Sequence, residues 1–251
     1  QTFFLIVGIA TTVCGILGIF ILKDKPGMRA NNENYFKNII YGFRPSTVKK
    51  NPRLYIAFAA FCIFSIAYQV FMPYIIIYLE KTLGITDYAI PLGVILILSA
   101  VISVLFGRVI DKVGKIRCLL PAAIVLVIGF VLMYFAKGDN LPVLMVFGTV
   151  MMGTYLVASA CICGTIRDYT PTDKVGLFQG VRIVFQVLIP MVTGPYIGAA
   201  VIANNNQTYV ELGTGKTIPT ANIFLASAAV AVFSLIPIIV LLKTEKSKKS
   251  I

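Results

Sequence analysis

The chain has 251 residues, of which 58% are hydrophobic and 13% are charged, and its formal net charge is +12. Soluble domains carry about 25% charged residues, so this composition excludes an ordinary soluble globular protein. Histidine is absent and no acidic residue lies within the long apolar runs, so the chain lacks an evident catalytic group or metal-ligand set. We therefore expect neither an enzyme nor a metal-binding protein.

Seven stretches of the chain contain no Asp, Glu, Lys or Arg, and each reaches or nears the roughly 20 residues that span a bilayer as a helix. A backbone in lipid must satisfy its own hydrogen bonds, and these runs lack the alternation of barrel strands. The sequence therefore predicts an all-α membrane protein with seven transmembrane helices. The runs cover residues 2–22, 54–79, 88–107, 118–136, 140–166, 183–210 and 217–242.

The first run is predicted to be a transmembrane helix over residues 1–22, because no basic segment precedes it as in a signal peptide. Residues 23–53 form a basic linker, and residues 54–251 hold six spans and a basic tail. Apolar side chains in the linker recur at helical spacing, which predicts an amphipathic helix on the membrane surface; a plain loop is the alternative. These side chains are Tyr35, Phe36, Ile39, Ile40 and Phe43.

The basic residues indicate the orientation of the chain. If the seven runs span the membrane, 19 of the 22 Lys and Arg residues fall on one side and 3 on the other. The basic side is expected to be cytoplasmic. This places the N-terminus outside and the C-terminus in the cytoplasm. The charge of +12 thus describes topology, and we expect no nucleic-acid partner.

The most specific motif follows the third run and reads Gly107-Arg108-Val109-Ile110-Asp111-Lys112-Val113-Gly114-Lys115. Gly107 is expected to allow a close approach of two helix ends, and Gly114 a tight turn. Asp111 is expected to pair with a base or with a helix N-terminus, in a contact that locks one conformation. Lys112 and Lys115 belong to the same gating hypothesis. The alternative is a charged turn that only follows the charge asymmetry.

This motif resembles the signature loop of the major facilitator superfamily, which recurs between the second and third helices of each six-helix half. A second stretch, Arg167-Asp168-Tyr169-Thr170-Pro171-Thr172-Asp173-Lys174 followed by Gly176, Gln179, Gly180 and Arg182, is similar to the glycoside–pentoside–hexuronide:cation symporters, the melibiose-carrier group. That group often has Gly-Glu where this chain has Thr170-Pro171.

The resemblance implies a fold and a function for the whole chain. The first span corresponds to the last helix of the first half, and residues 54–251 to the complete second half, so five helices are expected to be missing from this chain. The implied activity is symport of a small solute, a sugar or glycoside, across the cell membrane. Na⁺ or H⁺ would be coupled at a site outside this chain, with no other cofactor.

Polar residues inside the spans are the best indicators of a substrate path, because lipid-facing positions should be apolar. On a regular helix, Gln179, Arg182, Gln186 and Thr193 fall on one strip about 60° wide. Arg182 and Gln186 are therefore candidates for binding hydroxyls or a carboxylate. Snorkelling of Arg182 and an interhelical bond of Gln186 are the alternatives.

Other spans carry further candidates. Tyr68 and Gln69 combine an aromatic ring with an amide, which suits a sugar, although packing would also explain them. Tyr155 and Ser159 lie one helical turn apart and are weaker candidates. Pro73 is expected to break its helix and act as a gate hinge.

Two alternatives to a sugar symporter stay open. A superfamily transporter of another solute (a drug, an organic anion or a nucleoside) is the first alternative. A seven-helix receptor is the second, but the chain lacks an outside cysteine pair, a D-R-Y motif after the third span and an N-P-x-x-Y motif in the last.

Overall fold

The computed structural model describes residues 2–21, 41–172, 174–203, 205–211 and 214–249. The chain divides into two units, residues 1–38 and 39–251. The first unit contains one described helix, α1 (Thr2–Ile21), whose side chains are almost all apolar and exposed. Its hydroxyls are satisfied internally: Thr11 Oγ1 donates to the Val7 carbonyl at 2.7 Å and Thr12 Oγ1 to the Gly8 carbonyl at 2.9 Å. This arrangement suits a helix surrounded by lipid.

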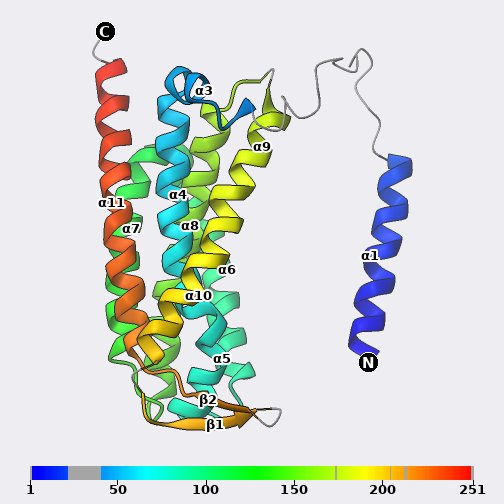
Figure 1. Ribbon diagram of the computed structural model, residues 1–251, viewed down its shortest axis with the longest axis vertical. Coiled ribbons are helices and arrows are strands. Elements are labelled where there is room, and N and C mark those ends of the chain that lie inside the picture. The colour runs from blue at the N-terminus through cyan, green and yellow to red at the C-terminus, as the bar shows by residue number, and fades with distance from the viewer. Residues whose placement is uncertain (1, 22–40, 173, 204, 212–213, 250–251) are drawn as a thin grey trace. The chain divides into compact units, whose positions relative to one another are not determined.

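The second unit is a bundle of long helices that run back and forth along one axis (Figure 1). With α1, the described residues include seven helices long and apolar enough to cross a membrane, which confirms the predicted all-α class. The elements of the bundle are α3 (Pro45–Lys50), α4 (Pro52–Phe71), η1 (Met72–Tyr74), α5 (Ile75–Ile77), η2 (Tyr78–Thr82), α6 (Ala89–Val113), α7 (Lys115–Tyr134), α8 (Leu141–Tyr169), α9 (Val175–Ile183), η3 (Val184–Leu188), α10 (Ile189–Ile202), β1 (Thr208–Glu211), β2 (Thr214–Thr217) and α11 (Asn222–Lys249).

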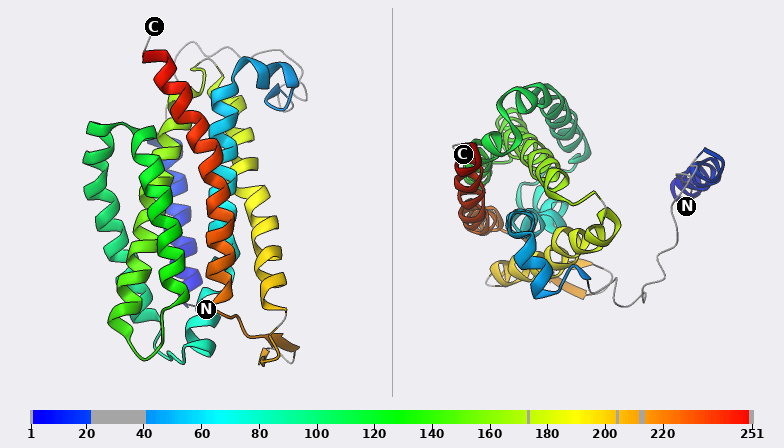
Figure 2. Two further views of the ribbon diagram at one scale, coloured as in Figure 1. Left: turned by 90° about the vertical axis from the view of Figure 1, so that its left-hand side faces the viewer. Right: turned by 90° about the horizontal axis from the view of Figure 1, so that it is seen from above.

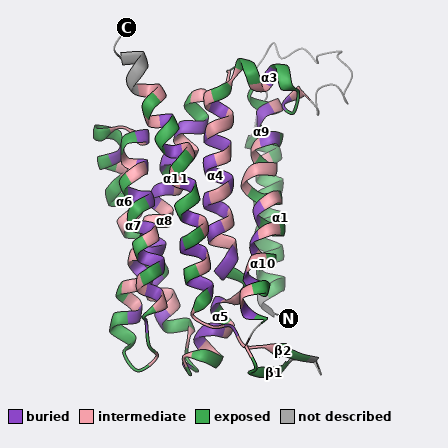
Figure 3. Cartoon of the chain, turned by 60° about the vertical axis from the view of Figure 1, so that its left-hand side comes forward, coloured by how far each residue is buried: buried purple, intermediate pink, exposed green. Residues whose placement is uncertain are grey.

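Helix α4 is the central helix of this bundle and packs against α11, α10 and α8 (Figure 2). Helix α8 in turn packs against α7 and α6. Four phenylalanine side chains of α4 are fully buried. Buried residues recur along the length of α4 (Figure 3), so the core lies along this helix. The four phenylalanines are Phe58, Phe61, Phe64 and Phe71.

Two prolines interrupt the regular helices. At Pro73, α4 changes to the 3₁₀ turn η1, so the predicted helix break is confirmed. Pro190 has no N–H to donate to the carbonyl of Gln186, and the five residues before α10 form the π-helical segment η3. The sixth predicted span is therefore made of two α-helices joined by a π-helical turn.

A β-hairpin lies in the connection between α10 and α11, where the sequence analysis predicted no strand. Strands β1 and β2 pair antiparallel, with Thr208 opposite Thr217. Side-chain bonds tie the flanking residues down: Thr82 Oγ1 donates to the Pro219 carbonyl at 2.5 Å, and Asn205 Nδ2 to the Ile218 carbonyl at 2.8 Å.

The bundle has two ends that differ in charge. We call one the α3 end; it holds α3, the α6–α7 junction, the start of α9 and the C-terminal part of α11 (Figure 1). The opposite hairpin end holds β1, β2 and the α7–α8 connection. The basic connections 108–117 and 167–174 lie at the α3 end, whereas Lys81, Lys137 and Lys216 lie at the hairpin end. The charge asymmetry read from the sequence is therefore an asymmetry between the two ends of one bundle.

Most of the predicted amphipathic helix, including Tyr35, Phe36, Ile39 and Ile40, lies outside the described residues. Phe43 is exposed. The two residues just before Phe43 contact the bundle: the Tyr55 hydroxyl donates to the Gly42 carbonyl, and Lys174 Nζ donates to Tyr41 Oη at 2.7 Å. The Lys174 hydrogen bond lowers the pKa of the Tyr41 phenol below its ordinary value.

Candidate functional site

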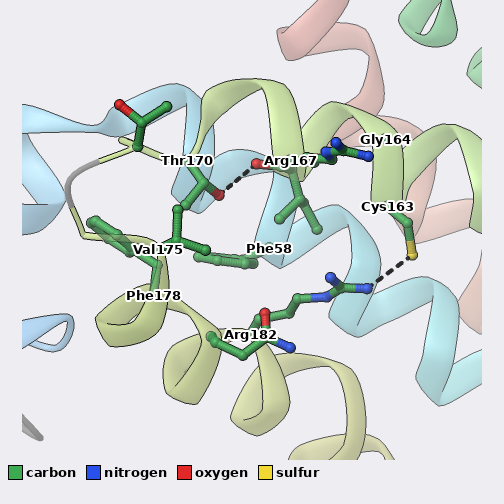
Figure 4. A pocket seen from close by; sticks show the side chains of 11 residues that line it. Phe58, Cys163, Gly164, Arg167, Thr170, Val175, Phe178 and Arg182 are labelled. Atoms are coloured by element: carbon green, nitrogen blue, oxygen red, sulfur yellow. Dashed lines mark hydrogen bonds between the residues drawn. The ribbon is translucent and has the colours of Figure 1, made fainter. Parts of the chain in front are cut away.

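A cavity of about 550 Å³ opens between α8 and α9 at the α3 end, against Phe58 of α4 (Figure 4). Both guanidinium groups in its wall, those of Arg167 and Arg182, come from these two helices. Among the described residues that line it, these two guanidinium groups are the charged groups. The lining residues are Phe58, Cys163, Gly164, Ile166, Arg167, Thr170, Thr172, Val175, Phe178, Gln179 and Arg182.

Arg182 is half-buried and has neutral hydrogen-bond partners. Its Nη2 donates to Cys163 Sγ at 3.3 Å (Figure 4). Its Nε donates to Gln186 Oε1 at 3.0 Å. The bond to Gln186 joins two residues four positions apart, as expected on one helix face. A guanidinium that no carboxylate neutralises is costly at membrane depth, unless water or an anionic group shares its cavity.

The predicted polar strip holds only in part. Helix α9 begins at Val175, and the structure places Gln179 and Arg182 on the cavity and Gln186 against Arg182. Thr193 follows η3, and a π-helical turn advances less per residue than an α-helical one. The strip prediction assumed a regular helix, and the Thr193 hydroxyl bonds the Ile189 carbonyl of its own helix at 2.8 Å.

An aromatic stack joins α4 to α8. The rings of Tyr68 and Tyr155 lie 4.1 Å apart between centroids, at 15° to each other. Phe64 stacks on Tyr155 at 5.0 Å and 3°. The structure thus brings together two candidate tyrosines that the sequence placed on separate spans.

One face of α8 connects this stack to the cavity. Tyr155, Ser159 and Cys163 are each four residues apart and all half-buried, so they lie on one face over about 12 Å. Cys163 reaches Arg182 at the far end of this row. Cys163 was not among the predicted site residues, although it lies four residues after Ser159 and therefore on the same helix face. Phe58 and Arg167 were also missed, because only the packing of α4, α8 and α9 brings them to one cavity.

Gln69 occupies a different place from Tyr68. It lies against α10, where a Cβ at Gly194 would come within 2.4 Å of Gln69 Cβ and 2.8 Å of its backbone carbon. Tyr74, beside Pro73, donates to the Pro195 carbonyl at 2.9 Å. Gln69 and Pro73 therefore belong to the α4–α10 contact, whereas Tyr68 belongs to the α4–α8 stack.

The Gly107–Lys115 motif forms the junction between α6 and α7. Gly114 alone separates the two helices and has φ +103°, which confirms the predicted tight turn. Lys115 runs over Gly164 of α8, and its Nζ reaches Asp168 Oδ2 at 2.6 Å. This ion pair ties the junction to the end of α8.

Two details of the motif differ from the sequence analysis. A Cβ at Gly107 would meet no described atom within 4 Å, so the expected close approach there is wrong for this bundle. Within the described residues Asp111 forms no ion pair, and Lys115 of the same motif pairs with Asp168. Lys112 is exposed. Asp111 does line a second cavity, of about 310 Å³, together with Lys115, Thr165, Asp168, Tyr169 and Glu245.

The two motif glycines should respond oppositely to alanine. Gly114→Ala forces a side chain into a left-handed conformation and should cost about 1 kcal/mol or more of stability, with a lower melting temperature in detergent. Gly107→Ala adds a methyl group to an open face inside α6 and should be neutral or stabilising by up to about 1 kcal/mol. Equal losses at both positions would contradict this assignment.

Among the described residues, no three Cys, Asp or Glu side chains are grouped as metal ligands.

The chain matches the family model described as Major Facilitator Superfamily over residues 1–188 and again over residues 92–251. Comparisons with curated proteins and with solved structures found no match. The two matched ranges together cover the cavity, the aromatic stack and the α6–α7 junction.

Proposed function

Because the chain belongs to the Major Facilitator Superfamily, and so to a family of secondary transporters of small solutes, we propose that it carries a sugar or glycoside together with Na⁺ or H⁺. The observation that supports this most is the row of half-buried residues from the Tyr68–Tyr155 stack to Arg182. Aromatic rings cover the apolar face of a sugar ring. The guanidinium of Arg182 and the amide of Gln186 can bond hydroxyl groups.

We propose that the α3 end faces the cytoplasm, since it holds most of the basic residues. Transporters of this kind bind the substrate between two helical bundles and rock around it. We infer that residues 39–251 supply one bundle and that α1 belongs to the other, together with five further helices. The coupling-cation site would lie in that other bundle.

Uptake by membrane vesicles tests this proposal. Vesicles with the protein expressed from its complete coding sequence should accumulate a radiolabelled sugar or glycoside, and a Na⁺ or H⁺ gradient should increase the accumulation. Vesicles without the protein are the control. No uptake of any sugar under any gradient would refute the sugar assignment.

A second candidate function is transport of an organic anion. It is favoured by the two arginines that the described part of the cavity wall carries. Unlabelled anionic and neutral sugars, such as glucuronate and glucose, can compete for the same uptake. Competition by organic anions alone would select this second function.

The Lys115–Asp168 pair should affect the transport rate more than stability. Both side chains are more than a third exposed, so solvent screening limits the pair to less than about 1 kcal/mol. We expect Lys115→Asp to slow uptake severalfold, because like charges then oppose the closed junction. The double change Lys115→Asp with Asp168→Lys should restore most of the rate. Failure of the double variant to recover would show that the pair is not a gate.

A further inference from the structure

A groove separates helices α6 and α7 on the outer surface of the bundle. The two helices join at Gly114 but make few contacts with each other, because each packs mainly against α8. This groove is a cavity of about 320 Å³, and Thr154 and Val157 of α8 also line it. It is separate from the cavity at Arg182 and from the cavity at Asp111.

The groove is apolar along its α6 wall. This wall runs from Val113, beside the junction, to Ile102, a distance of about 16 Å along the helix. Its outer half belongs to the charged connection and its inner half to the third apolar run, so the wall extends from the head-group region into the hydrocarbon. Phe106, Val109 and Val113 are exposed along this wall, so the groove opens to the surroundings of the bundle. A single acyl chain has the polarity and the length to fill it.

The mouth of the groove at the α3 end is basic. Arg117 is the one charged residue among the lining residues, and it is exposed. Lys112 lies about 80° around α6 from the groove wall, whereas Asp111 lies on the opposite side of that helix. The acid lines the other cavity instead. The charge at this mouth therefore favours an anion.

Pro121 adds a hydrogen-bond acceptor at the same place. It lies inside α7 and also lines the groove. Proline has no N–H, so it cannot bond the carbonyl of Arg117 four residues earlier. The regular helix bond to that carbonyl is therefore missing, and a donor from outside the helix can take its place. A hydroxyl of a lipid head group or glycerol can supply one.

From these features we propose that the α6–α7 groove binds an anionic phospholipid. One acyl chain lies along the apolar wall from Val113 to Ile102, and the phosphate lies on Arg117 at the membrane surface. This site would be occupied in the leaflet at the α3 end. It does not depend on which solute the protein carries.

These 251 residues contain no tryptophan, which allows a direct test once any tryptophan in the further helices has been replaced by phenylalanine. Phe106→Trp then places the single tryptophan of the protein in the groove, and it is excited beyond the absorption of tyrosine. Phe233→Trp, on an exposed position of α11 outside the groove, is the matched control. Both variants are reconstituted in phosphatidylcholine vesicles with increasing dibrominated phosphatidylglycerol, and quenching is compared with that by dibrominated phosphatidylcholine.

We expect phosphatidylglycerol to bind beside Phe106→Trp about fivefold more tightly than phosphatidylcholine, as one basic residue at a membrane surface gives. The Phe233→Trp control should show no such preference. Adding Arg117→Gln to Phe106→Trp should abolish it, whereas Arg108→Gln, about 120° away from the groove wall on α6, should leave it. Equal quenching by both lipids at Phe106→Trp would overturn the proposal, as would a preference that survives Arg117→Gln.

Discussion

Replacing Arg182 by glutamine is expected to lower solute uptake at least tenfold while the protein remains folded in the membrane. The guanidinium is the charged group that reaches deepest along the row from the cavity to the Tyr68–Tyr155 stack. A hydrogen bond to a charged group is worth about 1.5–3 kcal/mol, which corresponds to roughly a 10–100-fold change in rate or affinity. Initial uptake rates in vesicles, corrected for the amount of protein, measure this effect.

Two further variants separate a binding role from a structural one. Arg182→Lys keeps the charge but loses the paired bonds to Gln186 and Cys163, so we expect it to recover only part of the activity. Arg108→Gln removes an exposed charge that lines none of the three cavities described above, and it should leave uptake unchanged. Full activity of Arg182→Gln would show that this residue only snorkels to the membrane surface.

Alanine at Gly194 is expected to destabilise the bundle by about 1–3 kcal/mol, the usual cost of an overpacked contact. The added Cβ would lie 2.4 Å from Gln69 Cβ and 2.8 Å from the Gln69 backbone carbon, so α4 and α10 must move apart. Gly198→Ala should behave alike, because its Cβ would lie 2.4 Å from the Val70 carbonyl oxygen. Thermal denaturation in detergent measures both losses.

Gly180 provides the matched control for this prediction. It lies in α9, and a Cβ there would meet no described atom within 4 Å. Gly180→Ala should therefore be neutral or slightly stabilising, because alanine favours the helix. A loss of stability at Gly180 equal to that at Gly194 would mean that helix approach is not the cause.

Apolar runs were sufficient to predict the long helices. Lipid forces each such run to satisfy its own backbone, so span length and composition decide the structure. The β-hairpin at Thr208–Thr217 takes in the end of the sixth run and the start of the seventh, where the absence of charge does not distinguish a strand from a helix. The π-helical segment before Pro190 could not be placed either, since proline indicates an interruption but not its geometry.

The candidate site was predictable one helix at a time. Arg182 and Gln186 are four residues apart, and their side-chain bond follows from helix geometry alone. The contacts between helices did not follow from the sequence. Cys163 of α8 accepts a hydrogen bond from Arg182 of α9, and Lys115 pairs with Asp168 of α8. Both contacts depend on how the helices pack, which the sequence does not give.

Labelling of Cys163 from water tests most directly the claim that the α8–α9 cavity is an aqueous part of a transport path. Two variants are compared, one keeping Cys163 and the other Cys161 as its only cysteine. Cys161 is two residues away and fully buried. We predict that a negatively charged, membrane-impermeant sulfonate thiol reagent modifies Cys163 readily from the α3 side and leaves Cys161 unmodified. If Cys163 is as unreactive as Cys161, the cavity is closed to water and the proposed path is contradicted.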